Sequence, residues 1–419
     1  MDRYQNDVGV LVPRVMLPDK NEDFYKWAVV ACDQFTSQPE YWQRVEQLVG
    51  EEPSAFRLIL PEAQLSDGHT EEHIANINEA MLAYQKNQVF QEYPDAMIYL
   101  ERVQSDGRIR RGVIGKIDLD EYDYSPDSTS LVRATEGTVL ERIPPRQAVR
   151  RGASLELPHI MLLIDDPDNT VIGPLADSAK AGQCGDIVYD FDLMEGGGHA
   201  KSWLMTDAQK ASVEEALEKL MDRSGGDHPL LFAMGDGNHS LASAKAHYEE
   251  EKAKGLPSAA LSKYALVEVV NLYDDALEFE PIHRVLFDVN PEDVLAELAA
   301  AYPGTHEGDG EGHSIRYAWE KGEGILTIPQ PKAQLEVGTL QTFLDDYLKQ
   351  KGGRIDYVHG DDITIELGKK PGCLGLLLPA MDKNDLFRSI AADGPLPRKT
   401  FSMGHAADKR YYIEARKIK

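Results

Sequence analysis

The organisation of this chain is set by Leu230-Leu231-Phe232-Ala233-Met234-Gly235-Asp236-Gly237-Asn238-His239-Ser240. The five apolar residues before Gly235 predict a buried strand, and the alanine- and glutamate-rich run after Ser240 predicts a helix. Glycine allows backbone conformations that other residues avoid, and a helix start offers unpaired N–H groups and partial positive charge. Such a loop can bind an anion. Most strand-to-helix turns of this composition nevertheless bind nothing.

The composition indicates a globular protein with a strongly acidic surface. The 419 residues include 44 Lys and Arg against 71 Asp and Glu, which gives a formal net charge of −27. This charge repels nucleic acid and anionic membrane surfaces, so neither is expected as a partner. A local basic pocket can still hold a small anion.

The cysteine pattern and the N-terminus predict the compartment. Cys32, Cys184 and Cys373 are far apart and show no CxxC spacing, so we expect a reducing compartment and no cysteine-based zinc site. The first residues lack the apolar core of a signal peptide, and no run of about 18 apolar residues occurs. We therefore expect a cytoplasmic protein.

Strands, helices and hairpins along the chain predict a mixed α/β (α+β) fold with partly antiparallel sheets. The clearest hairpin joins strands at 96–104 and 109–119 through Asp106-Gly107, a strong turn signal. Asn290 as cap and Pro291 at the first helical position mark a helix start. Further strands are expected at 58–61, 264–271, 279–287, 355–359 and 363–367.

The acidic, glycine-rich loop 304–312 is the best candidate for a junction between two parts of the chain. We expect a main α/β domain over residues 1–303 that carries the Asp236–His239 loop. A smaller C-terminal α+β subdomain over 304–419 is expected to pack on it.

Residues 33–37 are expected to connect a short buried strand at 27–32 to a helix at 41–49. Ser37 and Glu40 have the spacing of a capping box. Loops of this kind often carry functional groups.

Six arginines gather between 111 and 151 in a chain that is otherwise acidic. They can form a solvated segment that makes ion pairs with its surroundings. Alternatively, some guanidinium groups turn inward, where their fork geometry suits phosphate or carboxylate. The six are Arg111, Arg133, Arg142, Arg146, Arg150 and Arg151.

Four histidines, His159, His199, His239 and His283, lie within or beside strand ends, but their spacing matches no common metal-binding pattern. We expect most of them to be packed and hydrogen-bonded. Mg²⁺ is favoured over zinc because it prefers oxygen ligands and bound phosphate. The candidate carboxylates are Asp236, Asp190, Asp192 and Glu136.

The Asp236–His239 loop suits phosphoryl transfer, which needs phosphates to be positioned, their charge neutralised and a nucleophile oriented. The helix start and His239 are expected to hold the phosphates with Lys245 or an arginine. Asp236 or Glu136 is expected to bind metal or take a proton. We therefore predict Asp236, His239 and Glu136 as catalytic residues, with Asp236 also as the metal ligand.

Four segments follow one another along the chain: Ala28-Val-Val-Ala-Cys-Asp-Gln-Phe-Thr-Ser-Gln-Pro-Glu-Tyr-Trp, Arg133-Ala-Thr-Glu-Gly-Thr-Val-Leu-Glu-Arg-Ile-Pro-Pro-Arg, Gly235-Asp-Gly-Asn-His-Ser and Glu280-Pro-Ile-His-Arg-Val. Together they resemble the domain of unknown function 1015 family over essentially the whole chain. The loop of that family is similar to one in the ParB and sulfiredoxin superfamily, where a comparable loop at a helix start holds nucleotide phosphates. That superfamily includes free-serine kinases and DNA-partitioning nucleotidases.

This chain departs from the common family loop at two positions. Asn238 stands where the first histidine usually lies, and Ser240 stands where an arginine usually lies. Loss of that arginine removes a phosphate ligand, so nucleotide binding would need a replacement from elsewhere. Sulfiredoxin chemistry is not implied, because no cysteine lies near Gly237 in the sequence. The candidate replacements are Arg142, Arg146 and Arg284.

The resemblance implies a nucleotide-dependent phosphotransferase that acts on a small metabolite, with a hydroxy amino acid such as serine as the example of a substrate. It also implies ATP or ADP with Mg²⁺ as cofactor. The alternative is a non-catalytic sensor that binds a nucleotide or metabolite in the same pocket. A homodimer is compatible with the sequence, whereas DNA binding conflicts with the net charge of −27. The expected cofactor-binding residues are Gly235, Gly237, Asn238, Ser240, Arg133, Arg142, Arg146, His283 and Arg284.

Overall fold

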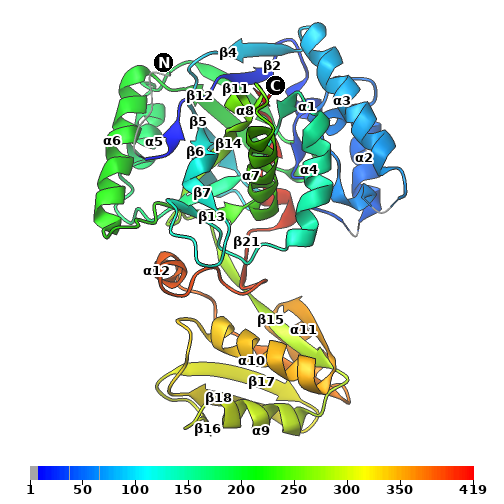
Figure 1. The fold of residues 1–419 in the computed structure, drawn as a ribbon, viewed down its shortest axis with the longest axis vertical. Helices are drawn as coiled ribbons and strands as arrows, with labels where there is room; N and C mark the ends of the chain where they lie inside the picture. The colour runs from blue at the N-terminus through cyan, green and yellow to red at the C-terminus, as the bar shows by residue number, and fades with distance from the viewer. Residues whose placement is uncertain (1–7, 37, 66) are drawn as a thin grey trace. The chain divides into compact units, whose positions relative to one another are not determined.

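The computed structural model describes residues 8–36, 38–65 and 67–419, and the chain forms two compact units (Figure 1). Unit 1 comprises Met1–Ala134, Thr138–Leu277 and His405–Lys419, and unit 2 comprises Thr135–Gly137 and Glu278–Gly404. The expected division at residue 303 assigned the strand at 279–287 to the first part. That strand is hydrogen-bonded to strands of unit 2, so unit 2 begins earlier than the acidic loop.

Unit 1 contains a mixed sheet of ten strands among the described residues. In spatial order these are β11 (Ile187–Asp192), β12 (His199–Leu204), β5 (Ile98–Val103), β6 (Ile109–Asp118), β14 (Tyr264–Asn271), β10 (Met161–Ile164), β13 (Phe232–Asp236), β8 (Val132–Arg133) and β7 (Tyr122–Asp123), with β1 (Val10–Leu11) beside β6. β10 is parallel to β14, and β8 is parallel to both β13 and β7. The other pairs are antiparallel.

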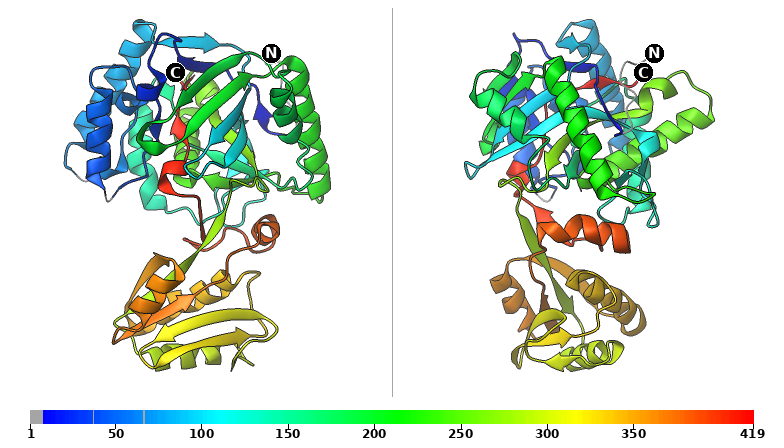
Figure 2. Two further views of the ribbon diagram at one scale, coloured as in Figure 1. Left: turned by 180° about the vertical axis from the view of Figure 1, so that it is seen from behind. Right: turned by 90° about the vertical axis from the view of Figure 1, so that its left-hand side faces the viewer.

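The central strands of this sheet are buried on both faces. Successive side chains of a strand point to opposite faces, so neighbouring residues of one strand enter different cores. In β5, Ile98 and Leu100 pack into one core and Tyr99 packs into the other. The two layers of helices are visible in Figure 1 and Figure 2. Helices α2 (Pro39–Val49), α3 (Thr70–Lys86) and α4 (Ile143–Gly152) contribute to the first core, and α5 (Gly173–Lys180), α6 (Asp207–Ser224) and α7 (Asn238–Ala253) contribute to the second.

The end of the chain is part of unit 1 rather than of a separate C-terminal subdomain. β22 (Tyr411–Tyr412) pairs with β3 (Val29–Val30), and β23 (Arg416–Lys417) pairs with β9 (Leu155–Glu156). A further small sheet joins β2 (Val15–Pro18) to β4 (Phe90–Tyr93). The C-terminal segment therefore completes the first core, with Tyr411, Tyr412 and Ile413 buried in it.

Unit 2 is built on an antiparallel sheet covered by helices. Its described strands are β16 (His306–Glu307), β18 (Gly322–Ile328), β17 (His313–Trp319), β20 (Cys373–Leu377), β15 (Phe279–Phe287) and β19 (Arg354–His359), with β21 (Phe401–Met403) beside β15. Its longer helices are α9 (Pro291–Ala301), α10 (Glu336–Lys351), α11 (Asp361–Gly368) and α12 (Lys383–Asp393). The mixed α/β class with partly antiparallel sheets is thus confirmed.

Several predicted elements are confirmed and two are wrong. The hairpin forms with Val103 opposite Ile109, and α9 begins at Pro291. The strand expected at 58–61 is wrong, because Leu58 ends a 3₁₀ helix at Ala55–Leu58 that Ser54 caps, and residues 59–61 continue as irregular backbone. The strand expected at 363–367 is also wrong, since this segment is α11, whose first turn carries two aspartates that favour a helix start.

Ser37, one half of the predicted capping box, lies outside the described residues, and α2 begins at Pro39 with Gln38 as its N-cap. Within the described parts of the chain, every helix is too short or too polar to cross a membrane.

Candidate functional site

The candidate site of unit 1 lies where β13 ends and α7 begins. Gly237 is the N-cap residue of α7 and has a left-handed backbone conformation with φ 79° and ψ 26°. A Cβ atom at this position would lie 3.1 Å from Cα of Ile160. Glycine is therefore favoured at this turn both by its backbone angles and by the close neighbouring chain. The expected strand, turn and helix are all present.

Asp236 presents one bonded and one unbonded carboxylate oxygen. Oδ1 accepts a hydrogen bond from the Gly237 N–H at 2.8 Å. Oδ2 is buried and accepts no hydrogen bond from the described residues, although the Lys409 Nζ lies 3.5 Å away. Buried acceptors in native proteins are nearly always satisfied. The Oδ2 atom of Asp236 is thus a position at which a cation or a hydrogen-bond donor of a ligand would bind favourably.

A second carboxylate, Asp33, lies in the same region. The Nε2 atom of His159 is 3.9 Å from Oδ2 of Asp33. Burial raises the pKa of Asp33, but His159, the Gln34 amide and the charge of Lys409 together outweigh burial and hold that pKa below its usual value. Asp33 is therefore ionised at neutral pH, and the Lys409 ammonium, which pairs with Asp236, also stabilises the Asp33 carboxylate.

His159 connects three segments of unit 1. Its Nδ1 atom is 2.7 Å from the Tyr412 hydroxyl, and its Nε2 atom is 3.4 Å from Oγ of Ser240. Burial raises the pKa of Tyr412, so its hydroxyl keeps its proton and can donate to the imidazole. Ser240 lies in the first turn of α7, so His159 ties that turn to the C-terminal segment.

His239 lies beside two of the predicted arginines. Burial, followed by the positive charges of Arg146 and Arg142, lowers the pKa of His239 to about 4. The imidazole is therefore neutral at neutral pH. Its Nε2 atom accepts the Val139 N–H at 3.3 Å, so the ring proton is on Nδ1. His239 can donate a hydrogen bond to a ligand, but positive charge must come from the arginines.

The arginines of the 133–146 segment have different surroundings. Arg133 is buried and donates to the carbonyls of Ser130 and His228, both at 2.9 Å, so it holds loops together. Arg146 on α4 forms an ion pair with Glu62. Within the part of the chain that the structure describes, the exposed guanidinium of Arg142 makes no ion pair or hydrogen bond. Arg146 lines a cavity together with Ser240 of the loop, and the charge of Arg142 acts on His239, whereas Arg133 serves the fold.

Glu136 and His283 belong to unit 2 and bond to residues of that unit. The Glu136 carboxylate accepts the Lys399 N–H at 3.1 Å. His283 contacts Asp361 through Nε2 at 3.0 Å, and its Nδ1 atom accepts the Leu378 N–H at 3.1 Å. The two nitrogens of His283 are thus occupied inside unit 2.

Arg284 is also committed within unit 2. Its guanidinium donates to Gln341 at 3.1 Å and to the carbonyls of Ile282 and Arg398, and it stacks 5.1 Å from the centre of the Tyr357 ring. Burial lowers the pKa of Arg284 to about 10. These contacts give Arg284 a structural role in unit 2.

No group of three or more His, Cys, Asp or Glu side chains in the described residues is arranged to hold a metal ion. Asp190 and Asp192 each contact His199 at 2.7 Å, and Asp190 also pairs with Lys201. Mg²⁺ in nucleotide sites is commonly held by one or two carboxylates together with phosphate oxygens. The buried Oδ2 of Asp236 is the carboxylate oxygen of the site that fits this requirement.

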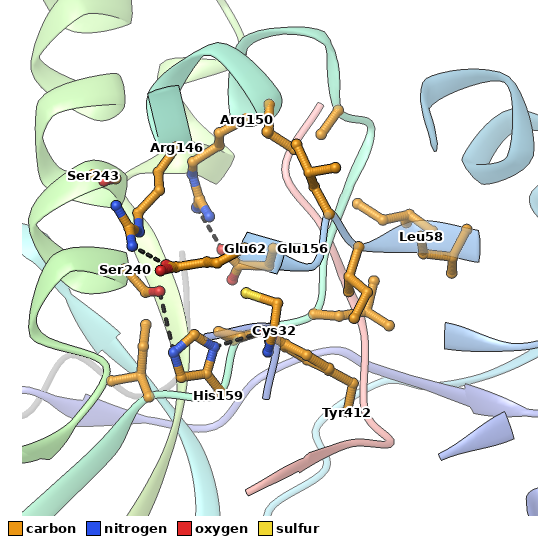
Figure 3. Close-up of a pocket in the computed structure, with 18 of the residues that line it drawn as sticks. Cys32, Leu58, Glu62, Arg146, Arg150, Glu156, His159, Ser240, Ser243 and Tyr412 are labelled. Atoms are coloured by element: carbon orange, nitrogen blue, oxygen red, sulfur yellow. Dashed lines mark hydrogen bonds and ion pairs between the residues drawn. The ribbon is translucent and has the colours of Figure 1, made fainter. Parts of the chain in front are cut away.

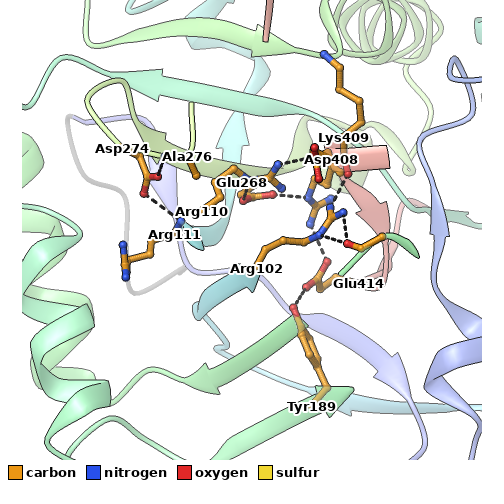
Figure 4. A network of polar contacts seen from close by, with 12 residues as sticks. Arg102, Arg110, Arg111, Tyr189, Glu268, Asp274, Ala276, Asp408, Lys409 and Glu414 are labelled. Atoms are coloured by element: carbon orange, nitrogen blue, oxygen red, sulfur yellow. Dashed lines mark hydrogen bonds and ion pairs between the residues drawn. The ribbon is translucent and has the colours of Figure 1, made fainter. Parts of the chain in front are cut away.

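A buried ion network fixes the backbone around Lys409 (Figure 4). Arg410 pairs with Glu268 at 3.0 Å and with Glu414 at 2.7 Å. Arg102 donates to the carbonyl of Lys409 at 2.6 Å and to that of Ala407 at 2.8 Å. The Lys409 side chain therefore extends toward Asp236 from a well-held segment.

The family model described as "Protein of unknown function (DUF1015)" matches residues 13–372. The chain belongs to the DUF1015 family. A comparison of this DUF1015 chain with curated proteins found no match.

Solved structures resemble the DUF1015 chain only distantly. A free serine kinase in complex with AMP has a TM-score of 0.39 at 10% identity, over 72% of this chain and 91% of that chain. SbnI from Staphylococcus aureus, truncated at its C-terminus, has a TM-score of 0.38 at 10% identity, over 70% of this chain and 82% of that chain. A conserved hypothetical protein from Pyrococcus furiosus has a TM-score of 0.37 at 11% identity, over 72% of this chain and 94% of that chain.

Sequence reasoning did not select Asp33, His159 or Lys409 as site residues. Asp33 lies in the loop 33–37 and inside the first family segment, so a signal for it was present. His159 was one of four histidines with no pattern to distinguish it. Lys409 had no local signal, because its position depends on the return of the C-terminal segment to unit 1.

Proposed function

We propose that the protein is a nucleotide-dependent phosphotransferase that acts on a hydroxyl group of a small metabolite, with a hydroxy amino acid such as serine as the model acceptor. The observation that carries this proposal is that Arg146 and Ser240, the latter in the first turn of α7, line one cavity, and that the charges of Arg146 and Arg142 lower the pKa of the neighbouring His239. Helix N–H groups and guanidinium groups together provide donors and positive charge for phosphate. Lys409, beside Asp236, adds a third positive charge in a chain whose net charge is −27.

The proposed chemistry assigns proton transfer to Asp236. The acceptor hydroxyl oxygen forms a bond to the terminal phosphorus, and the bond from that phosphorus to the bridging oxygen breaks. The leaving nucleotide takes the electron pair, and the hydroxyl proton passes to the Oδ2 atom of Asp236. Lys409, with its Nζ 3.5 Å from this oxygen, would offset the negative charge of the site.

The remaining residues have positioning roles in this proposal. His239 would donate a hydrogen bond from its Nδ1–H to a phosphate oxygen. Arg142 would bind the phosphate in place of the arginine that the common family loop has at the position of Ser240. Mg²⁺ would be bound by the phosphate oxygens of the nucleotide, where it would neutralise phosphate charge and leave the Oδ2 atom of Asp236 available for the hydroxyl proton. Glu136, His283 and Arg284 have no assigned part in the step, because their contacts are within unit 2.

The test is transfer of a terminal label from ATP or ADP, with Mg²⁺, to serine and to a pool of hydroxy amino acids. We expect a labelled phosphorylated product, and we expect Asp236→Asn to lower its rate by about 100-fold or more because a general base is lost. Asp190→Asn, which changes a surface carboxylate, is the matched control. Bound but intact nucleotide after incubation would replace this proposal by the sensor function.

A further inference from the structure

A cavity of about 150 Å³ in unit 1 borders the loop and shares Arg146, His159 and Ser240 with the candidate site. Its apolar walls come from the segment before Glu62, from α3 and α4, and from the segment around β9. Most of these walls are buried. The principal apolar lining residues are Leu58, Leu60, Met81, Val149, Ala153 and Leu155.

The volume of the cavity indicates what it can hold. An apolar cavity of about 150 Å³ lined by Leu, Ile and Phe side chains stays dry and binds benzene. The cavity of this protein has a similar volume, and its apolar walls are joined by two Arg–Glu pairs and a polar end. It therefore has room for an apolar group of roughly six carbon atoms.

The charged residues at the cavity are paired with one another. Arg146 pairs with Glu62 and Arg150 pairs with Glu156, as Figure 3 shows. Burial raises the pKa of Cys32 to about 12, so its thiol is uncharged. A charged group placed among these residues would have to compete for an existing partner, whereas an apolar group would not. The lining thus favours an uncharged guest.

One end of the cavity is polar and borders the candidate site. His159 and Ser240 lie at this end, with the Nε2 and Oγ atoms 3.4 Å apart, and Leu58 lies at the opposite side (Figure 3). Ser240 also belongs to the first turn of α7. A molecule in the cavity would therefore direct its polar end toward the turn that carries the Asp236–His239 loop.

We propose that this cavity binds an uncharged apolar group of about six carbon atoms, carried by a small hydroxy compound whose polar end faces His159 and Ser240. The identification of that compound as the phosphoryl acceptor rests on the proposed function. It deepens that function by naming the acceptor class: a hydroxy compound with an aliphatic or single-ring substituent. Serine, which has no such substituent, would leave the cavity empty.

The cavity itself is tested with benzene as the probe, without any nucleotide. Saturating benzene should raise the melting temperature of the wild-type protein by about 1–3 °C. Ala153→Leu and Val149→Phe, which fill the cavity from two different walls, should abolish that rise. Ala211→Leu, on the exposed face of α6, is the control and should retain it. An equal rise in all variants, or no rise in the wild type, would overturn the proposal.

The acceptor assignment is tested by the ratio of kcat/KM for β-phenylserine to that for serine in the label-transfer reaction. We expect a ratio of at least about ten in the wild type, which is the discrimination that a small apolar pocket supplies. The ratio should approach one in Ala153→Leu. An unchanged ratio would overturn the assignment. If benzene binds but neither compound is phosphorylated, the proposed function fails while the apolar binding site stands.

Discussion

Lys409 and Arg410 are neighbours in the sequence, but they belong to two polar clusters of different character. The side chains of Arg410, Glu268 and Glu414 are at most 2% exposed and are paired with one another. Lys409 and Asp236 are 16% and 15% exposed, so this pair is in contact with solvent. The first cluster has the character of a structural anchor, and the second has that of a binding site.

The largest expected effect concerns the anchor. Arg410→Met leaves Glu268 and Glu414 without their common partner in a buried region. We expect the free energy of unfolding to fall by about 3–5 kcal/mol, as measured by chemical denaturation. Arg223→Met, which breaks an exposed pair with Asp168, should cost less than about 1 kcal/mol. Similar losses in the two variants would mean that the buried network is not an anchor.

The next effect concerns the turn of the site. Gly237→Ala introduces a Cβ atom 3.1 Å from Cα of Ile160 at a left-handed backbone position. We expect a loss of about 1–3 kcal/mol in the free energy of unfolding. Gly255→Ala has a left-handed backbone with φ +64° but open space around the new Cβ, so its loss should be smaller. Equal losses would remove the argument that the turn is closely packed against the neighbouring chain.

A smaller effect is expected in the pH dependence of stability. His239 keeps a pKa of about 4 in the folded protein against an ordinary value of 6.5. Between these values the unfolded chain binds more protons, so the free energy of unfolding decreases as the pH falls from 6.5 to 4. Because His239 is only partly buried, we expect this decrease to be about 1–2 kcal/mol.

The variant His239→Gln should lack this part of the pH dependence, and the exposed His69→Gln should keep it. The measurement is a series of denaturation curves across the acidic range. A wild-type curve that runs parallel to the His239→Gln curve would contradict the assignment of a neutral imidazole.

The smallest effect on stability is expected for Lys409→Met. The ion pair with Asp236 is partly exposed, so its loss should change the free energy of unfolding by no more than about 1 kcal/mol. The same change should lower the rate of label transfer at least tenfold, because the charge beside Asp236 is lost. A stability loss as large as that of Arg410→Met would show that the two clusters do not differ in the way described.

Local sequence signals predicted much of the fold. The Asp106-Gly107 turn set the register of its hairpin, and Asn290 with Pro291 set the start of α9. The two incorrect strands, at 58–61 and 363–367, are short apolar runs for which periodicity does not separate a strand from a helix. In these segments the caps and first-turn aspartates decided the conformation.

The candidate site was predictable only in part, because it depends on contacts between distant segments. The loop at Gly237 was visible from its glycines, and Arg142 and Arg146 were visible as basic residues in an acidic chain. Nothing local distinguished them from Arg133, whose guanidinium is held by two carbonyls. Lys409 reaches Asp236 because the chain returns to unit 1 after residue 404, a feature of the tertiary structure.

The central claim is that the Asp236–His239 loop binds nucleotide phosphates with the help of Arg142, and calorimetric titration with Mg²⁺–ATP or Mg²⁺–ADP tests it most directly. We expect the wild-type protein to bind, and we expect Arg142→Gln to bind about 10- to 100-fold more weakly through the loss of charged hydrogen bonds. Arg151→Gln, in the last turn of α4 and paired with Glu250, should bind like the wild type. No binding at millimolar nucleotide, or equal affinity in Arg142→Gln and the wild type, would contradict the claim.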